Sequence, residues 1–307
     1  MRTFKVGLLA LVAWGVHSTL WGAWQKLENE HWKLSDLRPG WLAAAAAFYL
    51  LGQLGPGWFW YRTLRWLGQP ARPLDTLRAY YIGHVGKYAP GKAMVIVIRA
   101  GLLRGGGTTA TAATVAVFFE TLTTMGVGAA MAVILLAVRF TDDRWLIGAA
   151  VVLWAVVSAP TSPPVFRRLV KFTGAGKLDP EMADRLTHLR YGSLVWCWFE
   201  IAAGWLLMGL SLWATARSAG FPAKLGLFDE IAFCTAAVAI AVVGGFLSFL
   251  PGGLAAREAA LLELLTPWYG ADGALVASIV SRLVWAVAEL AIASLLYASH
   301  ERSPLTP

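Results

Sequence analysis

The sequence predicts an all-α protein that crosses a membrane several times, and three observations support this fold class. First, 58% of the 307 residues are hydrophobic, 14% are charged, and the mean hydropathy is +0.59, which is far from the balance of a soluble domain. Second, there are 16 tryptophans, many beside apolar runs, where indole rings favour the membrane interface. Third, Cys197 and Cys234 lie in apolar segments, so we expect them to be packing residues, and the sequence indicates neither a disulfide framework nor a thiolate metal site.

Apolar runs of about 20 residues, the length that crosses a bilayer, predict about six full spans. We place them near residues 4–24, 40–61, 108–138, 144–160, 191–214 and 273–298, and interpret residues 1–307 as a single transmembrane domain. The first run follows a basic start but is long and has no small-residue cleavage site. We therefore expect a retained span in place of a signal peptide.

Two further regions contain Pro-Gly breaks in apolar sequence. One is "GKYAPGKAMVIVIRAGLL" (86–103), within a polar region at 74–104, and the other is "FLSFLPGGLAAREAALLELL" (246–265), within 226–266. Irregular backbone survives at membrane depth only where it is buried in protein or lines a wet cavity. We therefore predict two re-entrant helical hairpins. If residues 229–250 instead form a complete span, the C-terminus lies outside.

The formal charge of +8 concentrates in loops between apolar runs, which indicates membrane orientation and not nucleic-acid binding. The loop at 161–190 is the most basic, so we expect it in the cytoplasm. If 74–104 enters from the cytoplasm and 226–266 from outside, every loop falls on its expected side. The two hairpins would then be inverted relative to each other, as in transporters built from inverted repeats.

Ionisable residues at membrane depth are costly and usually face a cavity or a partner. A cationic set around a negatively charged ligand, with half-helix N-termini and balancing acids, gives these candidate substrate-binding residues: Lys87, Pro90, Gly91, Lys92, Arg99, Glu120, Glu200, Pro251, Gly252, Gly253, Arg257, Glu258, Arg282 and Glu289. The alternative is that they form buried ion pairs between helices. Lys92 and Arg99 are also long enough to reach the cytoplasmic surface. Arg282 and Glu289 are seven residues apart, too far for a direct bond, so we expect each to have another partner.

At the two breaks the sequence resembles the lysylphosphatidylglycerol synthase transmembrane-region family, which is flippase-like. The resemblance lies in "FLPGGLAAREAALLELL", in the helix "ALVASIVSRLVWAVAELAIASLLY" after it, and in "YAPGKAMVIVIRAGLL" upstream. It implies movement of a lipid, or of a lipid-linked head group, between leaflets. We do not expect aminoacyl transfer, since the sequence up to Pro307 contains no soluble synthase domain.

We therefore expect a multi-pass protein of the cell (plasma) membrane that transports or binds a lipid and is not an enzyme. Its partner would be a membrane lipid with an anionic or zwitterionic head group, or a polyprenyl phosphate, with no catalytic residues, cofactor or metal. A membrane enzyme and a second copy of the chain are the other partners that we consider. The alternative is a membrane enzyme or accessory subunit that acts on a lipid phosphate or a polyprenyl-linked sugar.

Overall fold

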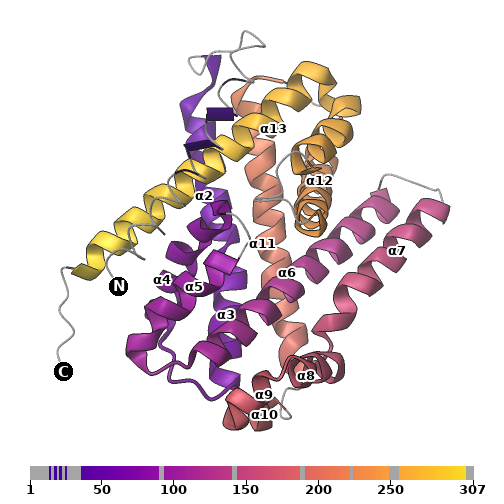
Figure 1. The fold of residues 1–307 in the computed structure, drawn as a ribbon. Coiled ribbons are helices and arrows are strands. Elements are labelled where there is room, and N and C mark those ends of the chain that lie inside the picture. The colour runs from indigo at the N-terminus through magenta and orange to yellow at the C-terminus, as the bar shows by residue number, and fades with distance from the viewer. Residues whose placement is uncertain are drawn as a thin grey trace.

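The computed structural model describes residues 36–89, 93–139, 144–186, 191–221, 224–248 and 256–301, with residues 14, 17, 18, 21, 22 and 25. Every regular element in these ranges is a helix (Figure 1), which confirms the all-α class. The α-helices are α2 (Pro39–Gly52), α3 (Leu54–Trp66), α4 (Pro73–His84), α5 (Ala93–Leu103), α6 (Ala110–Arg139), α7 (Arg144–Ser158), α8 (Pro163–Phe172), α9 (Ala175–Leu178), α10 (Pro180–Arg185), α11 (Tyr191–Ser218), α12 (Leu227–Leu247) and α13 (Ala256–Glu301). Short 3-10 turns are η2 (Val85–Tyr88), η3 (Arg104–Gly106) and η4 (Ala159–Thr161).

Four helices in the described ranges are long and apolar enough to cross a membrane: α6, α11, α12 and α13. The expected spans at 108–138, 191–214 and 273–298 coincide with α6, α11 and the later part of α13. The structure therefore supports a membrane protein but not the count of six spans. The expected first span, 4–24, lies mostly outside the described residues.

Two expected spans differ from the structure. The run at 40–61 is divided between α2, of 14 residues, and α3, of 13 residues, which meet at Gln53. The run at 144–160 forms α7, whose 15 residues fall short of the roughly 20 that a bilayer requires. Hydrophobicity alone did not show these limits, because both runs remain apolar beyond the point where the helix ends.

The regions around the breaks contain helices of unequal length. Before and after the first break, α4 has 12 residues and α5 has 11, and the two pack against each other. Around the second break, α12 has 21 residues, which favours the alternative of a complete span at 229–250 over a half-helix. After it, α13 has non-helical backbone at Gly270, where φ is 76°, so its first part, residues 256–269, is a short helix.

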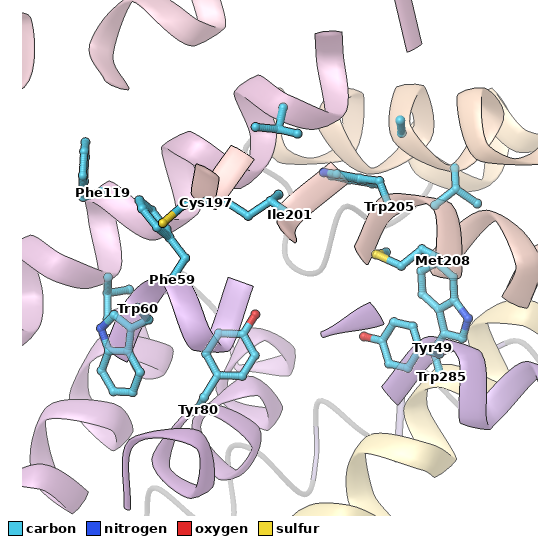
Figure 2. Close-up of a cluster of buried hydrophobic side chains, with 14 of the residues drawn as sticks. Tyr49, Phe59, Trp60, Tyr80, Phe119, Cys197, Ile201, Trp205, Met208 and Trp285 are labelled. Carbon is cyan, nitrogen blue, oxygen red and sulfur yellow. The ribbon is translucent and has the colours of Figure 1, made fainter. Parts of the chain in front are cut away.

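The centre of the bundle is α11, which packs against α2, α3, α6, α12 and α13. Figure 2 shows its buried side chains Cys197, Ile201, Trp205 and Met208 running past two aromatic groups. The helices approach closely at glycine: a Cβ atom on Gly204 would lie 2.5 Å from the carbonyl oxygen of Gly52. Small residues allow such backbone contact between membrane helices.

Hydrogen bonds to a buried glutamate connect α11, α12 and α13. Glu230, on α12, is fully buried, and its carboxylate accepts hydrogen bonds from Arg217 Nη2 at 2.5 Å and from the Tyr269 hydroxyl at 2.7 Å. Tyr269 is the residue immediately before the kink in α13. The bend of this helix is therefore anchored to its neighbours.

The basic loop at 161–190 contains the short helices α8, α9 and α10 below α7 (Figure 1). The helix α8 is amphipathic. It buries Phe166 and Val170 in the core, while Arg168 and Lys171 are exposed and Phe172 is 90% exposed. One face of this segment thus belongs to the bundle and the other is open.

Candidate functional site: a buried ionic cluster

The carboxylate of Glu289 lies where three distant segments meet. This side chain, on α13, is 2% exposed, and its Oε1 atom accepts a hydrogen bond from Lys87 Nζ, on η2, at 2.5 Å. The hydroxyl of Tyr49, on α2, donates to the same oxygen, and His84 Nε2 lies 3.7 Å from it. A buried carboxylate is thereby supplied with a charged partner and a neutral donor, as burial in apolar surroundings requires.

A second ion pair joins the two parts of α13. Arg282 Nη1, in the long part after Gly270, donates a hydrogen bond to Glu258, in the short part before it. Both side chains are largely buried, at 17% and 15% exposure. As their spacing in the sequence predicts, Arg282 and Glu289 do not bond to each other, and each has a different partner.

Arg257 completes this group. Its guanidinium lies over the ring of Trp285, with Cζ 4.0 Å from the ring centroid, a cation–π contact. Trp285 in turn stacks on Tyr49, with ring centroids 4.4 Å apart (Figure 2). Arg257 also interacts electrostatically with Arg282, Tyr88 and Glu289. We call Lys87, Arg257, Glu258, Arg282 and Glu289 the central ionic cluster.

The central ionic cluster has unused hydrogen-bonding capacity and excess positive charge. Buried Nη2 of Arg257 and buried Oε2 of Glu289 have no hydrogen-bond partner among the described residues. The three cations and two carboxylates give a formal charge of 3 − 2 = +1. A guanidinium is always charged and presents five N–H donors, so an unpaired buried nitrogen favours an added acceptor, most readily an oxyanion.

Arg99 and Glu120 form a separate, self-contained pair. Arg99 Nη1 donates to Glu120 at 2.9 Å, and both side chains are buried. The expectation that Arg99 can reach the cytoplasmic surface is wrong, since its guanidinium lies 4.0 Å from the ring centroid of Tyr80. Gly83 makes room for this path: a Cβ atom there would lie 2.4 Å from Arg99 Cγ. The ring contact of Tyr80 with His84 on α4 links this pair to the neighbourhood of Glu289, since His84 Nε2 lies 3.7 Å from that carboxylate.

Glu200 lies apart from both groups. Its carboxylate pairs with Arg62 Nη2, on α3, at 3.0 Å, and Arg62 Nη1 donates to Cys197 Sγ at 3.3 Å. Both charged side chains are about a quarter exposed. The structure therefore gives Glu200 the role of joining α3 to α11 and does not bring it to the central ionic cluster.

The two Pro-Gly breaks themselves are not placed by the structure. Pro90, Gly91, Lys92, Pro251, Gly252 and Gly253 lie outside the described residues. The residues beside the breaks are described, and Tyr88 and Arg257 interact electrostatically. Residues next to the two breaks are therefore close enough to influence each other electrostatically.

Sequence reasoning missed four neutral residues of this site: Tyr49, His84, Trp285 and Tyr88, whose ring lies 5.3 Å from Lys87 Nζ. Two of them left a signal. Tyr49 is the only side chain with a hydroxyl in α2, and Trp285 is three residues after Arg282 and four before Glu289, on one helical face. In the part of the chain that the structure describes, no group of three or more His, Cys, Asp or Glu side chains is arranged to hold a metal ion.

Spanning helices around a buried, cation-rich cluster define the class: a helical integral membrane protein with an internal polar site. The family model of the lysylphosphatidylglycerol synthase TM region matches residues 4–293, so the chain belongs to this family. The expected family membership is thus confirmed over nearly the whole chain. A comparison with curated proteins finds no match.

Proposed function

We propose that the central ionic cluster binds the phosphate-bearing head group of a membrane lipid, and that the protein lets this lipid move between leaflets of the plasma membrane without changing it chemically. The lipid would be an anionic or zwitterionic phospholipid or a polyprenyl phosphate. One observation carries the proposal: Arg257, within a cluster of formal charge +1, has a buried nitrogen with no hydrogen-bond partner among the described residues.

The chemistry of the cluster suits a phosphate that binds and leaves. Without a head group, Glu289 and Glu258 accept hydrogen bonds from Lys87 and Arg282, which limits the cost of charges inside an apolar bundle. A bound phosphate brings oxygens that can accept from Arg257 and compete for Lys87 and Arg282. Lys87 and Arg282 each have several N–H donors, so they can bind the phosphate and still donate to Glu289 and Glu258, and a singly charged phosphate then neutralises the +1 charge of the cluster.

The arrangement of short helices supports an internal passage. We propose that α4 and α5 form the re-entrant pair at the first break, entered from the cytoplasm, and that the short part of α13 is its counterpart at the second. Both carry residues of the central ionic cluster or lie next to them: Lys87 follows α4, and Arg257 begins α13. A head group would then cross at this level while its hydrocarbon chains stay in the lipid.

The proposal is tested with purified protein in liposomes, assayed for movement of labelled phospholipids and of a polyprenyl phosphate between leaflets. Arg257→Lys keeps the charge but loses the planar fork of donors, so we expect slower transfer at normal yield. Arg62→Lys is the matched control, because Arg62 is a partly buried arginine paired with Glu200 outside the cluster. It should leave transfer unchanged.

Two results would contradict the proposal. If the wild-type protein moves neither class of lipid, transport is not its activity. If Arg257→Lys and Arg257→Ala both transfer lipid at the wild-type rate, the cluster is not the head-group site. Loss of protein in Arg257→Ala alone would instead indicate that the contact of Arg257 with Trp285 is structural.

A further inference from the structure

A large apolar groove lies beside the central ionic cluster. It has a volume of about 770 Å³ and runs between α2 and the long part of α13, with His17 and Trp21 contributing from the N-terminal segment. Of its lining side chains, all but His17 are hydrophobic. Ala46, on α2, and Ala288, on α13, are among them, and such small side chains let a ligand lie close to the helix backbone.

The groove and the central ionic cluster occupy adjoining faces of the same two helices. On α13, Val284, Ala288 and Leu295 line the groove, whereas Trp285 and Glu289 point to the cluster. On α2, Ala46 and Leu50, three residues before and one residue after Tyr49, likewise line the groove. The Tyr49–Trp285 stack therefore lies at the line that separates an apolar surface from an ionic one.

Apolarity alone does not select an occupant here. Lipid tails surround a membrane protein, so an apolar groove gains little from the hydrophobic effect that pulls ligands out of water. A chain attached to a bound head group is different, since the attachment raises its effective concentration at the neighbouring surface. The adjoining positions of the two surfaces make one amphiphilic molecule the ligand that suits both.

We infer that the groove holds one hydrocarbon chain of the same lipid whose phosphate binds the central ionic cluster. The inference rests on the proposed head-group site, and it adds a second subsite that selects for an attached long chain. Tyr49 and Trp285 form the partition between the two subsites. Head group and chain would therefore lie on either side of this stacked pair.

The test is photo-crosslinking in vesicles with two probes that carry the same diazirine-labelled acyl chain, a phosphatidylglycerol and an uncharged diacylglycerol. Crosslinked positions are mapped by mass spectrometry. We expect the phosphatidylglycerol to label residues 42–50 and 280–295 more strongly than the diacylglycerol. Because Arg257→Ala removes the attachment point, it should lower that labelling by roughly tenfold or more.

Variants of the groove complete the test. Ala46→Phe fills the groove and should abolish the labelling, whereas Ala47→Phe, at an exposed position of α2 outside the groove, should not. Ala43→Leu, at an exposed groove position, replaces Ala46→Phe if that variant fails to fold. Binding of glycerol 3-phosphate, which has no chain, should be the same in all three.

Equal labelling of the groove by both probes would overturn the inference, because the groove would then be an ordinary contact with bulk lipid. The inference would also be overturned if the groove were labelled as strongly in Ala46→Phe or Ala43→Leu as it is in Ala47→Phe. Failure of the proposed transport looks different: labelling would still depend on the phosphate and on Arg257, while no lipid moves between leaflets in the liposome assay.

Discussion

Lys87 and Glu289, which are 202 residues apart in the sequence, form a 2.5 Å ion pair inside the helical bundle. The pair joins the turn before the first Pro-Gly break to the last long helix. It is charged, largely buried, and shared with the hydroxyl of Tyr49. Removing either partner leaves a buried charge, whereas removing both does not, and this difference can be measured.

Lys87→Met should destabilise the protein by about 3–5 kcal/mol, because Glu289 then keeps a buried charge without its cation. The double variant Lys87→Met/Glu289→Gln should recover most of this loss. Thermal unfolding in detergent, followed by tryptophan fluorescence, measures the change. If the double variant is as unstable as the sum of the two single variants, the residues do not act as a pair.

Glu120→Gln should destabilise the protein by a similar amount, about 3–5 kcal/mol, since Arg99 would remain buried without a counter-charge. Lipid transfer by the folded fraction should stay near the wild-type rate, because this pair lies outside the central ionic cluster. The surface pair Arg185–Glu181 is the control: Glu181→Gln should change stability by at most about 1 kcal/mol. A stable Glu120→Gln variant with abolished transfer would instead place this pair in the transport site.

Gly204→Ala should cost about 1–3 kcal/mol, because its Cβ atom would lie 2.5 Å from the Gly52 carbonyl oxygen and force α2 and α11 apart. Gly192→Ala, on the same helix, meets no atom within 4 Å. It should be neutral or slightly stabilising, as alanine favours helix. Thermal unfolding of both variants checks the prediction, and equal stability would mean that the two helices are not in backbone contact.

The segment containing α8 should face the cytoplasm, because its basic residues exceed its acidic ones. Phe172→Cys, at a 90% exposed position, should be labelled by a membrane-impermeant maleimide only after intact cells are opened. Cys197 and Cys234, which are buried, are replaced by alanine to give a clean background. Labelling of intact cells would reverse the predicted orientation.

Hydrophobic length predicted the parts of the fold that depend on composition alone. Runs of sufficient length became α6 and α11 because burial in lipid requires an unbroken helix there. Hydrophobic length did not predict the break at Gln53, where α2 ends and α3 begins. Gly52, Gly55 and Pro56, which lie close to this break, are residues that weaken helices. Both α2 and α3 pack against α11, and the hydropathy of a run does not show how its helices pack.

For the site, the sequence indicated which charged residues are costly to bury, but not which of them contact one another. Lys87, Arg257, Arg282, Glu258 and Glu289 come together because η2 and both parts of α13 pack at one level of the bundle. Glu200 and Glu120 are equally costly, yet each is satisfied by an arginine elsewhere. Pairings of this kind depend on the rotation and height of each helix relative to the others, which no local pattern specifies.

The kink at Gly270 has a consequence for how binding and shape depend on each other. Tyr269, held by Glu230, fixes one side of the bend, and the Arg282–Glu258 pair bridges its two arms. A ligand that competes for Arg282 weakens that bridge, so occupancy of the site and the angle of α13 are thermodynamically linked. The linkage is reciprocal. If ligand binding changes the equilibrium between two bend angles of α13 by some factor, a shift from one angle to the other changes the affinity for the ligand by that same factor.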